Sequence, residues 1–259
     1  MKSRITRLLA AVLLIAVLSA GSLTAQGTGP EREVTLTAPD GLVLHGWLSG
    51  RPSEGPVPLI VALPMRGRTH TSYDQLTVEL VGRCRRDSLA LPYLLKLDLR
   101  GHGKSVAGDS ILVDYRDMSN DEYCKIPGDV AEMIRLVLAD ETLKIDTSRI
   151  AVVGASIGAN SAVMVTEHFA PIHRVVMLSP GADYRGLAPS PALEKYAGKV
   201  LIYAGQQDQY SYQSSTALAA MDPERISLKV FGNGDHGTTI INNDKDAMTY
   251  MLDWIFGGW

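Results

Sequence analysis

The segment AVVGASIGANSA, residues 151–162, places Ser156 between Gly154 and Gly158, directly after an apolar run. A G-x-S-x-G pattern between a strand and a helix is typical of a nucleophilic serine, because small flanking residues permit the sharp turn that exposes the hydroxyl. The alternative is a strand ending in a turn that merely requires small residues. The apolar segment before it and the helical segment after it favour the nucleophile, whose chemistry would be attack on an acyl carbon.

A serine hydroxyl needs a base, and His236 is the best placed histidine. It stands in FGNGDHGTTI, directly after the last apolar segment, where Gly232, Gly234 and Gly237 give the loop freedom to turn the imidazole inward. The alternative for His236 is a solvated loop position. The other histidines are expected at structural, surface or site-lining positions: His45, His70, His102, His168 and His173.

The base in turn needs a carboxylate that fixes its tautomer. Asp208, in GQQDQYS, is our predicted acid, and Asp183, in LSPGADYRG, is the rival. Asp235 is adjacent to His236 and points elsewhere if both residues are extended. Either acid gives the order serine, acid, histidine that is typical of this chemistry. For the carboxylate not used, a helix cap or a solvated loop position is expected.

An oxyanion formed at Ser156 requires backbone donors. The amide of Ile157, at the start of the predicted helix, is the first. The second is expected in the turn PMRGRTH, where Met65 or Arg66 offers an amide. Arg66 and Arg68 are more simply read as solvated side chains than as contacts to an acidic substrate.

Other chemistries are not supported by the sequence. DLRGHGKS, residues 98–105, contains GKS, but a phosphate loop needs glycine where Asp98 stands. No G-x-G-x-x-G follows the first strands, and no histidine–cysteine cluster has metal-ligand spacing. We therefore predict neither cofactor nor metal. The net charge of −3, without a basic block, argues against a nucleic-acid partner.

These residues must be positioned by an alternating series of strands and helices. Segments 33–38 and 43–48 flank the turn PDG and predict a hairpin. Further strands are predicted at 57–65, 94–101, 149–156, 173–181, 199–208 and 226–237, and helices at 71–84, 127–140, 157–169, 191–198, 211–221 and 243–256. Nearly uniform apolar strands indicate a mostly parallel sheet of about eight strands with helices on both faces, in the α/β class. Sites in such sheets lie beyond the carboxyl ends of the strands.

The N-terminus has the features of a secretory signal peptide. MKSRITR is basic, residues 8–20 are apolar, and small residues surround Ala20 and Ala25. The apolar run is shorter than the roughly 20 residues of a membrane helix, although an uncleaved anchor is the alternative. We predict a signal peptide over 1–25, a single domain over 26–259, and export to the periplasm or medium.

Removal of the signal peptide would change the net charge from −3 to −6, because it removes three basic residues and no acidic one. A mildly acidic surface has no attraction for anionic membranes, so no stable insertion is expected afterwards. Export would place Cys84 and Cys124 in a compartment that permits disulfides, but their spacing does not settle whether they pair.

Over residues 33–257 the chain resembles the α/β-hydrolase fold family. DLRGHGKS is similar to the family signature after the fourth strand, and GASIGAN to its nucleophile elbow. LSPGADYRG, GQQDQYS and GDHG are similar to the segments after strands six, seven and eight, and the whole resembles the small dienelactone-hydrolase-like branch, many members of which are exported bacterial proteins. The resemblance implies Ser156, Asp208 and His236 as the catalytic triad.

The chain departs from this family at two points. Enzymes acting on dienelactone use cysteine as nucleophile, so Ser156 argues against that reaction. Pro64 stands where relatives often have histidine before the oxyanion turn. Only about 10–12 residues separate the sixth strand from the next helix, which leaves no room for a large lid there. The segment from Val106 to Cys124 is expected to wall the site.

The sequence thus predicts a serine hydrolase, and a carboxylic-ester hydrolase in particular, acting on a small or polymer-attached ester. A peptidase, amidase or acyltransferase with the same triad is the alternative among enzymes. A non-catalytic binding protein that keeps the fold is the alternative from another class.

Overall fold

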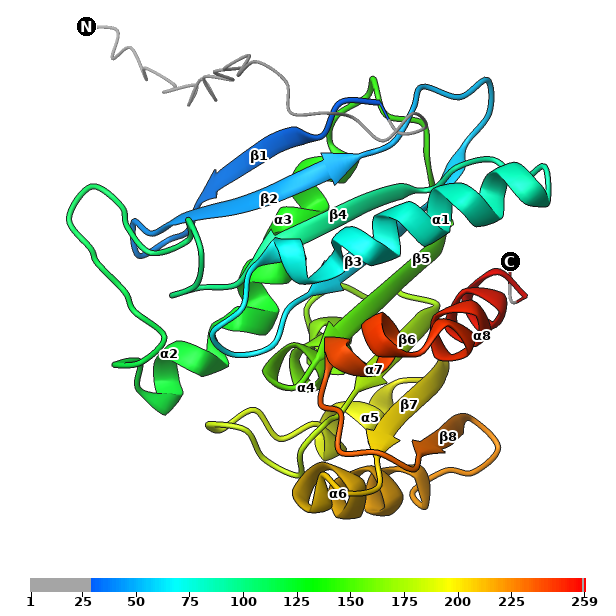
Figure 1. Ribbon diagram of the computed structural model, residues 1–259. Helices are drawn as coiled ribbons and strands as arrows, with labels where there is room; N and C mark the ends of the chain where they lie inside the picture. The colour runs from blue at the N-terminus through cyan, green and yellow to red at the C-terminus, as the bar shows by residue number, and fades with distance from the viewer. Residues whose placement is uncertain (1–28, 258) are drawn as a thin grey trace, which may run out of the picture.

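The computed structural model describes residues 29–257 and 259, so the predicted signal peptide lies outside the described residues. One eight-stranded sheet forms the centre of the molecule, in the order β1-β2-β4-β3-β5-β6-β7-β8 (Figure 1). The strands are β1 (Arg32–Thr37), β2 (Val43–Ser49), β3 (Val57–Leu63), β4 (Tyr93–Asp98), β5 (Ile145–Ala155), β6 (Arg174–Leu178), β7 (Lys199–Gly205) and β8 (Ile226–Phe231).

The pairing follows the predicted fold class. β1 and β2 form an antiparallel hairpin, and β2 is also antiparallel to β4. The remaining neighbours, from β4 through β3 to β8, are parallel. Every residue of β3 and β4 is buried, as expected for strands covered on both faces. The mostly parallel sheet with an antiparallel N-terminal pair is therefore confirmed.

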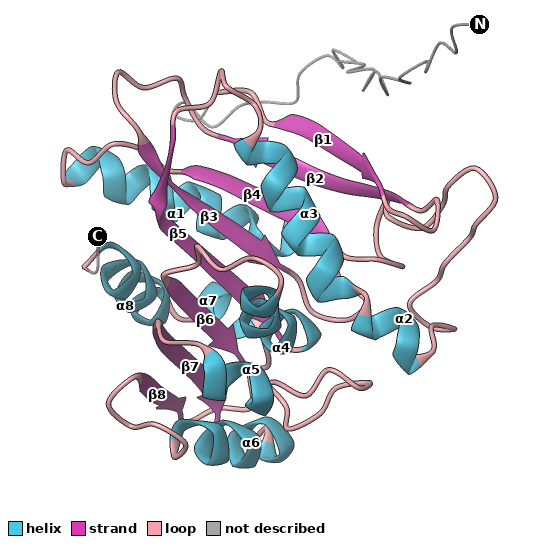
Figure 2. Cartoon of the chain, turned by 180° about the vertical axis from the view of Figure 1, so that it is seen from behind, coloured by secondary structure: helices cyan, strands magenta, loops and turns pink. Residues whose placement is uncertain are grey.

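Helices cover both faces of the sheet (Figure 2). They are α1 (Asp74–Arg86), α2 (Asn120–Cys124), α3 (Ile126–Leu138), α4 (Ile157–Met164), α5 (Ser190–Lys195), α6 (Gln209–Ala219), α7 (Thr238–Asn243) and α8 (Lys245–Phe256), with short 3₁₀ turns η1 (His70–Tyr73) and η2 (Val165–Glu167). Apolar side chains of α3, α4, α5 and α6 share one buried cluster, and those of α1, α7 and α8 share the other. The sheet separates the two clusters.

The structure differs from the predicted elements at two places. The predicted helix over 243–256 corresponds to α8, but it is preceded by α7, where no helix was predicted. Asp244 separates the two helices, because its backbone is extended and its carboxylate caps α8 by accepting from the amides of Asp246 and Ala247. α2 was not predicted, and Ser119 caps it by accepting from the amide of Glu122. Both differences reflect capping side chains that stop or start a helix locally.

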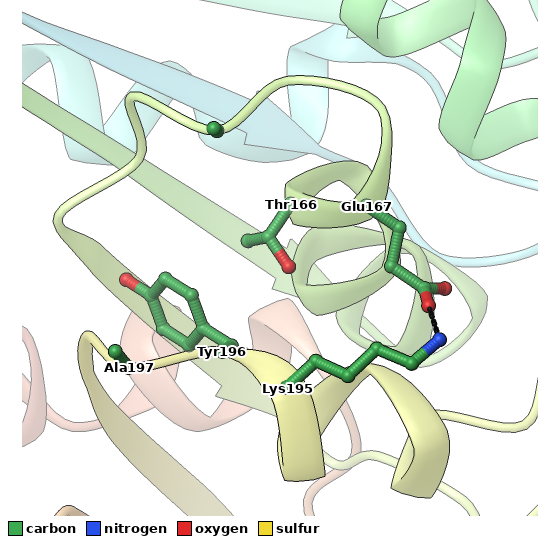
Figure 3. Close-up of a pocket in the computed structure, with 6 residues that line it drawn as sticks. Thr166, Glu167, Lys195, Tyr196 and Ala197 are labelled. Atoms are coloured by element: carbon green, nitrogen blue, oxygen red, sulfur yellow. Dashed lines mark hydrogen bonds and ion pairs between the residues drawn. The ribbon is translucent and has the colours of Figure 1, made fainter.

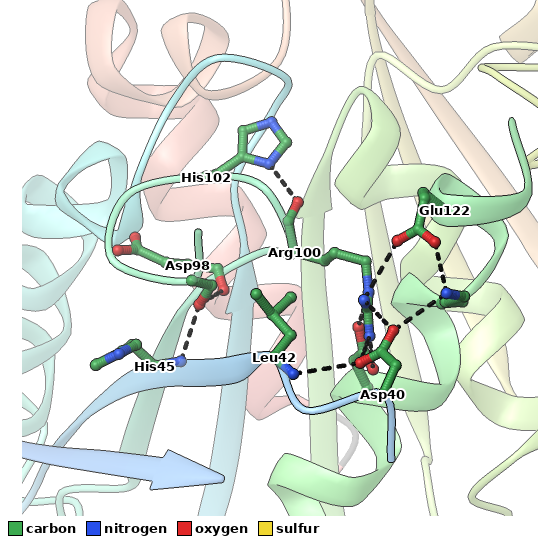
Figure 4. A network of polar contacts seen from close by, with 10 residues as sticks. Asp40, Leu42, His45, Asp98, Arg100, His102 and Glu122 are labelled. Carbon is green, nitrogen blue, oxygen red and sulfur yellow. Dashed lines mark hydrogen bonds and ion pairs between the residues drawn. The ribbon is translucent and has the colours of Figure 1, made fainter. Parts of the chain in front are cut away.

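Arg100, from the DLRGHGKS segment, is buried and forms ion pairs with carboxylates of three separate segments (Figure 4). Its guanidinium donates to both carboxylate oxygens of Asp129 on α3, at 2.8 and 3.0 Å. It also donates to Asp40 in the hairpin turn at 2.7 Å and to Glu122 on α2 at 3.3 Å. Because three carboxylates surround one buried cation, this part of the segment stabilises the fold.

Asp98, two residues earlier, holds the loops after β3 and β4 together. Its carboxylate accepts from the backbone and the ring Nδ1 of His70, at 2.8 and 2.9 Å, and from the amide of Lys104 at 2.8 Å. The His70 ring stacks on Trp47, with 3.4 Å between ring centroids. The sequence left open whether His70 lines the site or has a structural role. Its contacts with Asp98 and Trp47 are structural.

The two cysteines are not paired in this structure. Cys84 is buried on α1, while Cys124 is exposed at the end of α2. Within the described part of the chain, no helix is both long and apolar enough to cross a membrane.

Candidate active site

Ser156 lies at a strained turn between β5 and α4. Its backbone has φ 54° and ψ −116°, a conformation that costs a non-glycine residue about 1–3 kcal/mol. The turn is held by a hydrogen bond of 2.9 Å from its amide to the carbonyl of Leu178 at the end of β6. An outlier of this kind, at the carboxyl end of a central strand, is typical of a nucleophile elbow.

The two flanking glycines are required by close backbone contacts. A Cβ at Gly154 would lie 2.0 Å from the carbonyl oxygen of Gly158. A Cβ at Gly158 would lie 2.4 Å from the carbonyl oxygen of Leu63 and 2.6 Å from that of Pro64. The first turn of α4 therefore lies directly against the end of β3, which no larger residue would permit.

This contact brings the predicted oxyanion donors to the same edge of the sheet. Ile157 begins α4, and Met65 and Arg66 follow Pro64 in the turn after β3. Within the described residues, none of these three amides donates to a protein acceptor. These amides are therefore available to a further acceptor at this edge of the sheet, as donors to an oxyanion must be.

Asp208 and His236 are in contact at the ends of β7 and β8. Asp208 Oδ2 lies 2.5 Å from His236 Nδ1. Asp208 precedes α6 but makes no capping hydrogen bond with its side chain, so its carboxylate is available to the imidazole. The side chain of Asp208 is 20% exposed and that of His236 is 36% exposed, so the pair is accessible from solvent. Thr239 fixes the backbone of His236, accepting from its amide at 2.9 Å.

The other two carboxylates considered as the acid have different partners. Asp183 Oδ1 accepts from the amide of Gly186 at 2.7 Å, within its own loop. Asp235 accepts from Asn233 at 2.9 Å and from Asn243 at 3.1 Å. The structure thus brings Asp208, and neither rival, to the imidazole of His236.

Ser179 fixes the loop of His236 beside the elbow, and sequence reasoning did not identify it. Its buried hydroxyl accepts from the amide of Gly237 at 2.9 Å. Gly237 also lies against Met65 and Ala155, since a Cβ there would be 3.0 Å from the sulfur and 3.3 Å from the Ala155 Cβ. The residue after His236 therefore contacts the residue before Ser156.

Tyr184 is a second site residue that the sequence did not single out. Its ring is edge-on to the His236 imidazole, with centroids 6.5 Å apart and an angle of 81°. Burial raises the pKa of the Tyr184 phenol, and the Asp208 carboxylate raises it further. The signal that could have identified it is its position in LSPGADYRG, the segment that follows β6.

The segment after β4 covers the oxyanion turn. Arg66 is exposed, but its guanidinium donates to the hydroxyl of Tyr123 at 2.8 Å and to the carbonyl of Tyr115 at 3.2 Å. The Tyr115 ring also lies beside Gly67, whose Cβ would be 3.2 Å from the tyrosine oxygen. These contacts place Tyr115 beside the turn that carries Met65 and Arg66.

A cavity of about 340 Å³ lies away from these residues (Figure 3). It is lined by Thr166, Glu167, Ala170, Lys195, Tyr196 and Ala197. These positions precede β6 and β7, so the cavity is at the amino ends of the strands, opposite the elbow. Its charged groups, Lys195 and Glu167, neutralise each other at 2.7 Å. Among the described residues, no group of three or more potential ligands could hold a metal ion.

The fold and the sharp turn at Ser156 are typical of one class of proteins, and a comparison of the sequence with family models identifies the same class. A family model for the alpha/beta hydrolase fold matches residues 102–244, more than half of the chain. The chain therefore belongs to the alpha/beta hydrolase fold family. No curated protein matches it.

Several solved structures share the fold at low identity. The esterase Pf2001 from Pyrococcus furiosus has a TM-score of 0.66 at 15% identity, over 93% of this chain and 96% of that one. An acetyl xylan esterase from Paenibacillus sp. R4 has a TM-score of 0.70 at 15% identity, over 92% and 86%. Est1E from Butyrivibrio proteoclasticus, solved with ferulic acid bound, has a TM-score of 0.61 at 18% identity, over 85% and 98%. These likenesses concern the fold.

Proposed function

We propose that the protein is a serine hydrolase that cleaves carboxylic esters through Ser156, His236 and Asp208. The observation that carries the proposal is the contact between Asp208 and His236, 2.5 Å apart, in a loop that packs on the residue before the strained Ser156. A strained serine, an oriented imidazole and unpaired amides at one sheet edge are features that acyl transfer requires, and they support the proposal.

In this proposal each residue has its own role. Asp208 accepts from Nδ1 of His236 and thereby leaves Nε2 as the base. His236 takes the proton of Ser156 while the serine oxygen attacks the acyl carbon, and then protonates the leaving alcohol. The amide of Ile157 and that of Met65 or Arg66 hold the oxyanion. Water then attacks the acyl-enzyme, again with His236 as base, and releases the acid.

The substrate is proposed to be a small or polymer-attached ester. The connection from β6 to α5 covers only residues 179–189, which is too short to form a large lid over the site. Of the structures with the same fold, one is an acetyl xylan esterase and another was solved with ferulic acid bound. Both names fit an ester on a bulky polar carrier better than a long free lipid.

Export remains part of the proposal. A basic start followed by the apolar run over residues 8–20 supports a signal peptide, and hence action on esters outside the cytoplasm.

The test is labelling with a fluorophosphonate probe together with hydrolysis of short p-nitrophenyl esters. The wild-type protein should label once and turn over, and Ser156→Ala should lose the label and about 10⁶-fold of turnover. Ser110→Ala, at an exposed serine, is the matched control and should behave as wild type. A wild type that neither labels nor hydrolyses would favour the non-catalytic binding protein. Faster cleavage of amides, or transfer to added alcohols, would favour the amidase or the acyltransferase.

A further inference from the structure

An exposed aromatic ring lies at the rim of the candidate active site. Tyr210 stands in the first turn of α6, two residues after Asp208, and is 48% exposed. Its ring meets that of Tyr184 edge to face, with centroids 5.5 Å apart. Tyr184 is in turn edge-on to the imidazole of His236, at 6.5 Å. The three rings therefore lead from the proposed base outward to a tyrosine that is open to solvent.

Tyr210 is held in one orientation by its hydroxyl. The oxygen accepts from the amide of Asp183 at 3.1 Å, and the hydroxyl donates to the carbonyl of the same residue at 2.8 Å. Both functions of the hydroxyl are thus used within the protein. The aromatic ring is the part of Tyr210 that remains for contact with a ligand.

The loop that holds Tyr210 is itself fixed to the helix of the nucleophile by one buried side chain. Asn160 lies on α4 and is fully buried. Its Nδ2 donates to the carbonyls of Gly181 and Leu187 at 2.9 and 2.7 Å, and its Oδ1 accepts from the amide of Gly181 at 3.1 Å. Asn160 thus holds both ends of the loop 181–187. Because the ring of Tyr210 is ordered in advance, a ligand that packs on it does not incur the entropic cost of fixing it.

The rim around Tyr210 is polar but carries no cationic side chain. It is formed by QQDQYSY, residues 206–212, and GNGDHG, residues 232–237, neither of which contains lysine or arginine. Their carboxylates accept hydrogen bonds from neighbouring side chains. The turn after β3, by contrast, exposes Arg66 and Arg68. Exposed amide side chains stand at four positions of the rim: Gln206, Gln207, Gln209 and Asn233.

An open aromatic face beside uncharged amides matches the chemistry of a saccharide. The C–H groups on one face of a sugar ring pack against an aromatic ring, while its hydroxyls exchange hydrogen bonds with amide groups, which both donate and accept. A carboxylate or phosphate would find neither lysine nor arginine on this rim. A long alkyl chain would cover amides with which it cannot form hydrogen bonds.

The position beside His236 identifies the half of the substrate that this rim would meet. In the mechanism proposed above, His236 passes the serine proton to the departing alcohol, so the alcohol half of the ester lies next to the imidazole. We infer that Tyr210 binds the alcohol half of the substrate, and that this alcohol is an uncharged saccharide. The inference rests on the proposed function and narrows its substrate class to esters of sugar hydroxyls. Hydrolysis consumes one water and releases the carboxylic acid and the free sugar hydroxyl.

The test compares methyl 6-O-acetyl-β-glucoside with ethyl acetate, both of which are acetates of a primary alcohol. Tyr210→Ala should lower kcat/KM for the glucoside ester about 3- to 10-fold, because the stacked ring is lost. For ethyl acetate, whose alcohol has no ring, kcat/KM should stay within about twofold. A pH-stat measures both reactions. Tyr250→Ala, at a tyrosine of α8 that is 43% exposed, is the matched control and should behave as wild type on both esters.

Tyr210→Phe separates the ring from the hydroxyl that holds it. It should keep kcat/KM for the glucoside ester within about twofold of wild type, because the stacking face remains. A loss in Tyr210→Phe as large as in Tyr210→Ala would assign the effect to the hydrogen bonds with Asp183 and would overturn the inference.

Two further outcomes would also overturn the inference while leaving the proposed function intact. One is an equal loss on both esters in Tyr210→Ala, and the other is a larger loss on hexyl acetate than on the glucoside ester. Binding can be measured without turnover, by saturation-transfer NMR of methyl β-glucoside with Ser156→Ala, and the signal should be lost when Tyr210→Ala is added. Undiminished hydrolysis of ethyl acetate by Ser156→Ala would instead remove the proposed function itself.

Discussion

Among the described residues, two aspartate–histidine pairs lie at the carboxyl ends of the strands, and they differ in how many hydrogen bonds the carboxylate accepts. Asp98 is 1% exposed and accepts two backbone amides in addition to the ring of His70. Asp208 is 20% exposed, and its side chain has the ring of His236 as its hydrogen-bond partner.

The imidazoles differ in the same way. The ring of His70 stacks on Trp47 and is 18% exposed, whereas that of His236 is 36% exposed and lies edge-on to Tyr184. One pair connects two loops, and the other is left open to a reacting partner. The same two residue types therefore connect loops where the carboxylate accepts several hydrogen bonds, and support the proposed proton transfer where the carboxylate and the imidazole are accessible.

Replacing each histidine by alanine should give the largest difference between the two pairs, one affecting turnover and the other the free energy of unfolding. His236→Ala should lower turnover by about 10⁴- to 10⁶-fold with little change in the free energy of unfolding, because it removes the base. His70→Ala should leave turnover within about tenfold but lower the free energy of unfolding by about 2–4 kcal/mol, because Asp98 loses a partner and Trp47 loses its stacked ring. Ester hydrolysis and urea unfolding measure the two effects. Equal losses of turnover would contradict the distinction.

The acids allow a finer comparison. Asp208→Asn should reduce turnover about 10⁴-fold, because the amide favours the wrong tautomer of His236. Asp183→Asn should change turnover only a few-fold, since its carboxylate accepts from Gly186 within its own loop. Steady-state kinetics of both variants measure the two losses of turnover. A larger loss in Asp183→Asn than in Asp208→Asn would identify Asp183 as the acid.

Asp98 should affect stability in a pH-dependent manner, and this is the smallest of the effects. Burial alone would raise the pKa of Asp98, but hydrogen bonds from the side chain and amide of His70 and from Lys104 outweigh it and lower the pKa. A carboxyl with a lowered pKa stabilises the fold above its unfolded value of about 3.9, and this contribution is lost as the pH falls through the folded value. Asp98→Asn should therefore cost about 2–3 kcal/mol at pH 7 and progressively less below about pH 4. Urea unfolding across pH 3–7 measures it, and a constant difference would refute the assignment.

The sheet and the placement of the candidate triad could be predicted from sequence for a shared physical reason. Apolar strands alternate with helices, so the parallel strands end at one edge of the sheet and the segments that follow them lie there. Ser156, Asp208 and His236 all have such positions. Chain order did not distinguish Asp208 from Asp183, because both lie between Ser156 and His236 in the sequence. The preference for Asp208, in the turn after β7, agrees with its contact with His236.

What could not be predicted are contacts between loops. Ser179 holds Gly237, and Asn160 holds Gly181 and Leu187, through side chains whose types are common at helix and strand ends. Periodicity records which face of an element is buried, but it does not record which backbone group a buried polar side chain will reach. The same is true of Arg100, whose segment was recognised as a motif while its partners, up to 60 residues away, were not.

The positive φ of Ser156 lowers the stability of the fold at the same residue that is proposed to act as the nucleophile. Glycine adopts such a backbone without the clash of a Cβ atom, so a library selected only for survival at high temperature would accumulate inactive molecules there. Directed evolution of this scaffold toward robustness should therefore hold codon 156 constant and look for gains elsewhere.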